Sequence, residues 1–258
     1  MTEEVDRTTG EDPTAGTSAP SIRRRTQAPA KPGDSIRLIG MRKIIAQRMH
    51  SSLQEMAQLT HGFEVRMDAV VAARAALKDA DEAAPSITDF VVRAAALALR
   101  EHPLLNAVVE EKAIRLYERI DIGLAVAVPN GLMLPVVRDA ADRSIGALGA
   151  EIRRLAEACR AGTVTPDEQA EPTFSVTSLG GYGVDMFTPI VTPGTVAILG
   201  VGRMRDGVEW DGDTPRRTRV MTLSLSFDHR AVDGAPAAEY LQTVGRLLAD
   251  PDRLLSEV

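Results

Sequence analysis

Residues 220–234 read Val220-Met221-Thr222-Leu223-Ser224-Leu225-Ser226-Phe227-Asp228-His229-Arg230-Ala231-Val232-Asp233-Gly234. From Leu223 to Phe227 apolar and small polar side chains alternate, which is typical of a β-strand with one face in the core. The same alternation predicts that His229 leaves the strand on the apolar side, where water is scarce. Gly234 predicts a tight backbone position shortly after. The stretch thus places a histidine at the end of a core strand.

His229 is the side chain in this stretch best suited to chemistry. An imidazole has an ordinary pKa of about 6.5, so its neutral form can take a proton from a thiol or an alcohol near neutral pH. Two other interpretations remain open from the residues alone. One is a structural histidine. The other is half of a metal site with Asp233, although zinc needs at least a third ligand and no nearby His or Cys supplies one.

Patterns elsewhere predict a mixture of helices and strands. Helices are expected over 41–55, 69–78 and 237–248, from Thr88 as N-cap to residue 102, and along an apolar stripe over 145–159 that ends near residue 162. Residues 165–168 form a predicted capping box. Strands are expected over 63–65, 114–117, 120–128, 132–137, 174–178, 196–201, 207–210 and 219–228, with Asn130-Gly131 as a turn. This order favours an α+β fold over a Rossmann-type fold.

Composition argues against several classes of protein. The net charge of −6 opposes a general affinity for nucleic acid or for an anionic membrane, and the longest apolar region, 122–137, is interrupted by Pro129-Asn130-Gly131. Cys159 is the only cysteine and lies on the apolar stripe, so we expect a core residue and a cytoplasmic protein. Residues 1–36 are polar and predict a disordered tail, which leaves 37–258 as one catalytic domain.

Several ordered motifs resemble those of one enzyme family. The segment from His229 to Gly234 has the pattern His-x-x-x-Asp-Gly. Together with residues 41–49, 104–107, 121–127, 129–132, 135–140, 173–180 and 187–190, it resembles the catalytic domain of 2-oxoacid dehydrogenase acyltransferases (the dihydrolipoamide acyltransferases) and the related chloramphenicol acetyltransferases. The resemblance covers the chain from residue 37 to about residue 255. It implies a two-layer α/β sandwich with a mixed sheet and helices on one face, and a homotrimer with active sites between subunits.

The resemblance also implies roles for individual residues. His229 would be the general base of a direct transfer that forms no acyl-enzyme. The hydroxyl of Thr177, at a position where many members carry serine, would stabilise the oxyanion from a neighbouring subunit. Asp233 would order the loop through an ion pair, for which we expect Arg48 as the partner.

Ser178, Gly180 and Gly181 are expected to bind substrate by shaping the acyl channel. The run Gly180-Gly181-Tyr182-Gly183 has an alternative interpretation as a dinucleotide-binding turn, but that fingerprint needs a third glycine where Met186 stands. We therefore favour the channel.

The chain contains no lipoyl attachment site of the usual kind, a lysine after an aspartate. Its lysines are Lys31, Lys43, Lys78 and Lys112, and none follows Asp. We accordingly expect no permanently bound cofactor, no metal, and acetyl-CoA or another acyl-CoA as the donor substrate. Because Leu254-Leu255 is followed by the less apolar residues 256–258, we expect a lone trimer rather than a larger cage.

Three functions follow from these expectations. The first is a free-standing acetyltransferase that acts on a hydroxyl of a small metabolite or of an acceptor on an acyl carrier protein, as in tetronate-type natural-product biosynthesis. The second is a dihydrolipoamide acyltransferase served by a lipoyl domain in trans. The third is a non-catalytic scaffold, which the presence of His229, Asp233 and Thr177 disfavours.

Overall fold

The computed structural model describes residues 31–80, 84–128 and 131–256. Residues from Arg37 onward form one compact unit. The expected disordered tail falls largely outside the described residues, as does Asn130 of the expected turn, so both stay predictions.

The described chain contains helices and strands in an irregular order. The helices are α1 (Gly40–Glu55), α2 (Asp68–Ala80), α3 (Ile87–Glu101), α4 (Ile145–Ala161), α5 (Gly234–Ala249) and α6 (Asp252–Leu255), with short 3-10 turns between some of them. The strands are β1 (Gln58–Arg66), β2 (Ala107–Val109), β3 (Ile114–Leu116), β4 (Ile122–Leu124), β5 (Val126–Val128), β6 (Gly131–Met133), β7 (Val136–Val137), β8 (Phe174–Ser178), β9 (Ala197–Asp211) and β10 (Thr214–Asp228).

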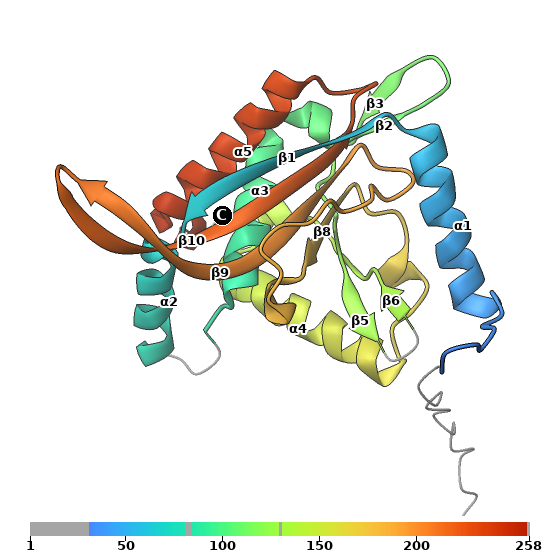
Figure 1. Cartoon of the computed structure of the whole chain (residues 1–258), viewed down its shortest axis with the longest axis horizontal. Coiled ribbons are helices and arrows are strands. Elements are labelled where there is room, and N and C mark those ends of the chain that lie inside the picture. The colour runs from blue at the N-terminus through green and yellow to red at the C-terminus, as the bar shows by residue number, and fades with distance from the viewer. Residues whose placement is uncertain (1–30, 81–83, 129–130, 257–258) are drawn as a thin grey trace, which may run out of the picture. The chain divides into compact units, whose positions relative to one another are not determined.

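Six strands form one mixed sheet whose order is β1-β10-β9-β8-β4-β7, and β2-β3 and β5-β6 form separate small sheets. In the main sheet β8 runs parallel to β4 and β9, and the other neighbours are antiparallel. Helices α2 and α5 contact strands of this sheet, and α3 packs beside α5 on the same face (Figure 1). The expected α+β fold with helices on one face of a mixed sheet is therefore confirmed.

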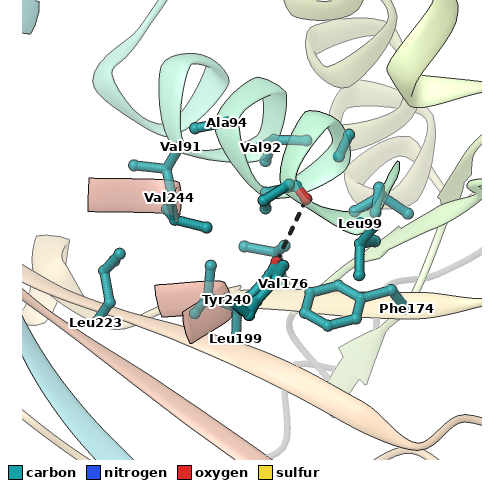
Figure 2. Close-up of a cluster of buried hydrophobic side chains, with 14 of the residues drawn as sticks. Val91, Val92, Ala94, Leu99, Phe174, Val176, Leu199, Leu223, Tyr240 and Val244 are labelled. Carbon is teal, nitrogen blue, oxygen red and sulfur yellow. Dashed lines mark hydrogen bonds between the residues drawn. The ribbon is translucent and has the colours of Figure 1, made fainter. Parts of the chain in front are cut away.

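The apolar face of the sheet forms the core with the helical layer. Figure 2 shows Val176, Leu199 and Leu223 of three strands beneath α3 and around Tyr240 of α5. Tyr240 is completely buried, and its hydroxyl donates to the Ala95 carbonyl oxygen at 3.4 Å. Burial raises the pKa of Tyr240, so the phenol stays neutral. Burial of these side chains is the main stabilising contribution to the fold.

A loop, residues 179–195, covers the opposite face of the sheet. The Met186 side chain approaches Gly62 of β1, and the backbone oxygen of Asp185 approaches Gly202 of β9 so closely that an added Cβ would lie 2.0 Å from it. Small residues on this face give the loop room. As a result the serines that alternate with the apolar residues of β10 are also buried, with Ser224 only 1% exposed.

The helix that was expected to start at Thr88 is capped elsewhere. Its N-cap is Ser86, whose hydroxyl accepts from the Asp89 N–H at 3.2 Å while the Asp89 carboxylate accepts from the Ser86 N–H at 2.7 Å. This reciprocal pair is a capping box. The prediction of Thr88 is wrong because it overlooked the carboxylate three residues after Ser86.

Four of the expected strands are divided or joined in the structure. Residues 120–128 divide into β4 and β5, which belong to different sheets, and 132–137 divide into β6 and β7. Pro135 lies at the second division because it has no N–H to donate to a neighbouring strand. Conversely, the expected strands 196–201 and 207–210 form one strand, β9, which begins at Ala197. Gly207 continues this strand and packs against Val220.

Helix α4 agrees with its sequence pattern. It ends at Gly162, which adopts a left-handed conformation with φ of 74°. Cys159 is buried on the inner side of this helix, as predicted, and burial raises the pKa of its thiol. A buried thiol of this kind is poorly suited to act as a nucleophile.

Candidate active site

His229 is the first residue beyond the sheet. Its backbone N–H donates to the carbonyl oxygen of Ala57, immediately before β1, at 2.8 Å. Its ring lies beside that of Phe227, with centroids 5.9 Å apart. The side chain is nevertheless 42% exposed in the single chain. Within the single chain the apolar side of the strand does not by itself exclude water from His229, because the sheet ends at Asp228 and α5 begins only at Gly234.

The buried carboxylate beside His229 is Asp228, which the sequence analysis did not single out. It is 1% exposed and forms a bidentate pair with Arg230, with Nε 3.0 Å from Oδ1 and Nη2 2.6 Å from Oδ2. The Ala57 N–H also donates to it, at 3.3 Å. Burial alone would raise the pKa of Asp228, but the hydrogen bonds from Arg230 and Ala57 outweigh it and hold the pKa below its ordinary value. The sequence signal that could have identified this ion pair is the triplet Asp228-His229-Arg230, in which residues of opposite charge flank the histidine.

Asp233 faces His229 across the loop. Its Oδ1 lies 3.7 Å from Nδ1 of His229, and its side chain is 85% exposed. The expected ion pair with Arg48 is not formed within the chain, since Arg48 lies on α1 and lines a separate cavity. Gly234 is not in a tight position within the chain either, because an added Cβ would meet only His61, at the ordinary contact distance of 3.6 Å.

The other expected site residues lie together at the far end of β8. Thr177 and Ser178 end this strand, and Gly180 and Gly181 form the turn after it. A Cβ on Gly180 would lie 2.7 Å from the carbonyl oxygen of Gly202, whereas a Cβ on Gly181 would meet nothing within 4 Å. Close contact therefore requires glycine only at the first of the two positions.

Thr177 and His229 are far apart within one chain. Thr177 is opposite Gly200, and Gly200 is opposite Ser224, five residues before His229. With about 3.3 Å per residue and about 4.8 Å between strands, the two residues are roughly 20 Å apart. A base acts on the group that attacks a carbonyl, and an oxyanion donor acts on the oxygen of that carbonyl, so both must lie at one reacting centre. The two side chains cannot serve one site from a single chain.

A cavity of about 880 Å³ lies between α1, the end of β3 and β6. Its lining combines apolar side chains, such as Ile44 and Leu132, with the guanidinium groups of Arg48, Arg115 and Arg119. Neither His229 nor Thr177 lines it, so it is distinct from both parts of the expected site.

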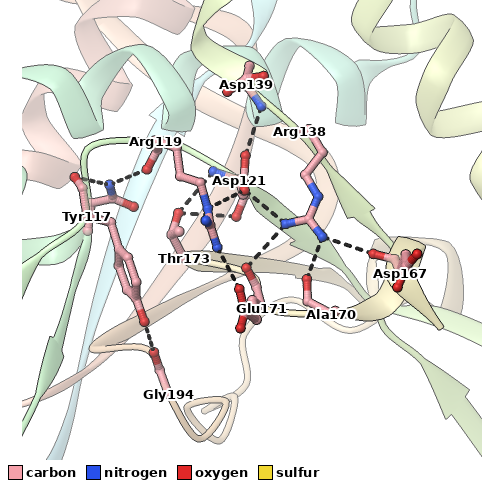
Figure 3. Close-up of polar contacts among 11 residues, drawn as sticks. Tyr117, Arg119, Asp121, Arg138, Asp139, Asp167, Ala170, Glu171, Thr173 and Gly194 are labelled. Atoms are coloured by element: carbon pink, nitrogen blue, oxygen red, sulfur yellow. Dashed lines mark hydrogen bonds and ion pairs between the residues drawn. The ribbon is translucent and has the colours of Figure 1, made fainter.

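One wall of this cavity is held by a buried carboxylate (Figure 3). Oδ2 of Asp121 lies 2.7 Å from Nε of Arg119 and 2.9 Å from Nη1 of Arg138, and Oδ1 accepts from the Asp139 N–H at 2.9 Å. Asp139 and Glu171 both have left-handed backbones, with φ of 50° and 48°. Such conformations are uncommon outside glycine and persist where surrounding contacts hold them.

Residues 31–80, 84–128 and 131–256 contain neither a metal-binding cluster nor a membrane-spanning helix. In these ranges His, Cys, Asp and Glu side chains do not gather in threes as a metal ion would require. Nor does any helix there have the length and hydropathy needed to cross a bilayer.

Comparisons with known proteins point to one family. Residues 30–256 match the family of 2-oxoacid dehydrogenases acyltransferase (catalytic domain). The chain is 39% identical over 224 residues to the dihydrolipoyllysine-residue acetyltransferase component of the acetoin cleaving system of Bacillus subtilis, covering 85% of this chain and 56% of the relative. It is 37% identical over 249 residues to the lipoamide acyltransferase component of the branched-chain alpha-keto acid dehydrogenase complex of Pseudomonas putida, covering 94% and 57%.

A solved structure gives the same result. The dihydrolipoamide acetyltransferase of Azotobacter vinelandii superposes with a TM-score of 0.81 at 31% identity, covering 89% of this chain and all of that one. The chain spans about half the length of the curated relatives it matches. The mixed sheet, the match along almost the whole chain and these identities lead to one conclusion: the chain belongs to the 2-oxoacid dehydrogenase acyltransferase family and corresponds to its catalytic domain.

Proposed function

We propose that this chain is an acyltransferase that moves an acyl group between CoA and the dihydrolipoyl group of a lipoyl domain, with His229 as the general base. One observation carries the proposal. The Azotobacter vinelandii enzyme was investigated for the catalytic roles of a serine, a histidine 52 residues later and an asparagine four residues after that. Thr177, His229 and Asp233 have the same two separations here. Threonine keeps the hydroxyl, and aspartate keeps an oxygen acceptor.

The proposed reaction exchanges one thioester for another. His229 takes the proton of the attacking thiol, and the thiolate sulfur bonds to the thioester carbonyl carbon to give a tetrahedral oxyanion. The Thr177 hydroxyl of another chain donates to that oxyanion. The carbon–sulfur bond to the leaving group then breaks, and the imidazolium returns its proton to the departing thiolate. No acyl-enzyme forms, and the same steps operate in either direction.

The proposed site requires more than one chain. The strand register supports this requirement, because it separates Thr177 from His229 by roughly 20 Å. The 42% exposure of His229 in the single chain leaves its ring accessible to a neighbour. We accordingly propose a homotrimer with a site at each interface; a trimer rather than a larger cage stays a prediction.

The relatives reverse the order of the functions that the sequence suggested. Both curated relatives reported above are named as dihydrolipoyllysine or lipoamide acyltransferase components. They favour a dihydrolipoyl acceptor over a small-metabolite hydroxyl, and they lend no support to tetronate biosynthesis. The scaffold interpretation is the least favoured, because the hydroxyl, the histidine and the acceptor oxygen are all present at the expected separations.

A direct assay tests the proposal. Purified protein is given acetyl-CoA with either dihydrolipoamide or a panel of small alcohols, and free CoA is measured. We expect turnover with dihydrolipoamide, and a loss of roughly 100- to 10000-fold in His229→Ala. His50→Ala, which removes an exposed imidazole on α1, is the matched control. Turnover of alcohols without turnover of dihydrolipoamide would overturn the proposed acceptor, and full activity in His229→Ala would overturn the proposed base.

A further inference from the structure

Three segments close a small ring of hydrogen bonds beside the start of β1. Nε2 of Gln58 donates to the Ser52 hydroxyl at 2.8 Å, and this hydroxyl donates to the Val191 carbonyl oxygen at 2.6 Å. The Val191 N–H donates in turn to Oε1 of Gln58 at 3.1 Å. We call these three residues the polar ring. Ser52 and Val191 are completely buried. Water therefore cannot reach their polar groups, and the bonds of the ring satisfy them instead.

The side-chain amide of Gln58 fits this ring in one orientation only. A reversed amide would place its NH2 group against the Val191 N–H, and its oxygen would then accept from the Ser52 hydroxyl, leaving the Val191 carbonyl without that donor. Nε2 also lies 3.3 Å from the Ser52 carbonyl oxygen, which accepts from the Met56 N–H at the end of α1. Gln58 therefore joins the last turn of α1 to the loop 179–195.

Ala57, which precedes Gln58 in the chain, contacts both Asp228 and His229. Its carbonyl oxygen accepts from the His229 N–H at 2.8 Å, and its N–H donates to Oδ1 of Asp228 at 3.3 Å. Ala57 is exposed and has only a methyl side chain, so its own side chain contributes little to fixing its position. Its position depends on its two neighbours in the chain, and the polar ring holds one of them, Gln58.

We infer that Gln58 is a positioning residue for His229, acting through the polar ring and Ala57 to fix the backbone from which the imidazole extends. This inference rests on the proposed function only in assigning the base to His229. Loss of the amide would leave the Val191 N–H without its partner, would remove the donor to the Ser52 hydroxyl, and would loosen Ala57. General-base catalysis needs the imidazole within hydrogen-bond reach of the attacking thiol, and small displacements are costly to the rate.

The kinetic test is Gln58→Ala. We expect kcat to fall about 10- to 100-fold, with the KM values for acetyl-CoA and dihydrolipoamide unchanged, because the displaced group acts on the transition state. Ser52→Ala opens the same ring, so the double variant should be no slower than the slower single variant. Tyr240→Phe removes a buried hydrogen bond on the helical side and should keep its kcat. A kcat of Gln58→Ala within about twofold of wild type, or a loss confined to KM, would overturn the inference.

Hydrogen exchange gives a readout that does not depend on turnover. The His229 amide is hydrogen-bonded to Ala57, and in Gln58→Ala it should exchange about 5-fold faster, since one buried hydrogen bond contributes on the order of 1 kcal/mol. In Tyr240→Phe its exchange should be unchanged. Equal exchange in wild type and Gln58→Ala would refute the positioning role. If wild type transfers no acyl group but the exchange rates differ as expected, the proposed function fails while the structural link from Gln58 to His229 stands.

Discussion

Two variants that are inactive alone should restore activity when they assemble together. His229→Ala removes the proposed base, and Thr177→Ala removes the proposed oxyanion donor. Because the strand register separates the two residues by roughly 20 Å within a chain, one site must take them from different chains. A mixed assembly can therefore contain a site in which both groups are intact.

The size of the effect follows from cyclic symmetry. In a trimer that contains both variants, in either ratio, one interface of the three pairs an intact base with an intact hydroxyl, so about one third of wild-type activity should return. Each parent should retain at most about 1%, given the roughly 100-fold minimum cost of losing either group. The expected signal is thus at least about 30 times the background.

The assay uses coexpression of the two variants with different affinity tags. Successive purification on both tags leaves only mixed assemblies, which are assayed with acetyl-CoA and dihydrolipoamide. A control assembly of His229→Ala carrying both tags should stay inactive. If the mixed assembly is no more active than its parents, the site is not shared between chains in the proposed way, and the argument from strand register is refuted.

Three further predictions concern stability. Burial lowers the pKa of His102 below its unfolded value of about 6.5, so its contribution to stability is present above that pH and is lost as pH falls through the folded pKa; the melting temperature of His102→Gln should fall less between pH 7 and pH 5 than that of wild type. Tyr240→Phe should lower the free energy of unfolding by about 1 kcal/mol and Tyr240→Ala by about 3–5 kcal/mol in denaturant titrations, and equal losses would contradict the packing in Figure 2. Gly202→Ala should cost about 1–3 kcal/mol because its Cβ would meet the Asp185 backbone, whereas Gly181→Ala, in open space, should stay within about 0.5 kcal/mol; a reversed order would rule out the observed path of the loop 179–195.

Local patterns predicted the parts of the fold that depend on neighbours in sequence. The alternation from Leu223 to Phe227 identified a core strand, and the apolar stripe ending at Gly162 identified α4. Both signals arise from side chains that repeat on one face of a single element, so no distant contact is needed to read them.

Contacts between distant segments could not be predicted from local sequence patterns. The serines of β10 look like the solvent side of a strand, because nothing local shows that residues 179–195 cover them. Shelter for His229 was predicted from strand parity, and that inference did not take into account that the neighbouring elements end before the histidine. The Asp228–Arg230 pair and the polar ring likewise depend on where Ala57 and Val191 lie in space.

The separation of Thr177 from His229 has a consequence for the life of a newly made subunit. On the proposed two-chain site, a monomer that has already folded completely is still chemically inert. Competence arises at the moment of association, so protein concentration, and not only folding, governs when thioesters begin to be consumed. Diluting the protein until its subunits dissociate should switch catalysis off reversibly without unfolding the chain.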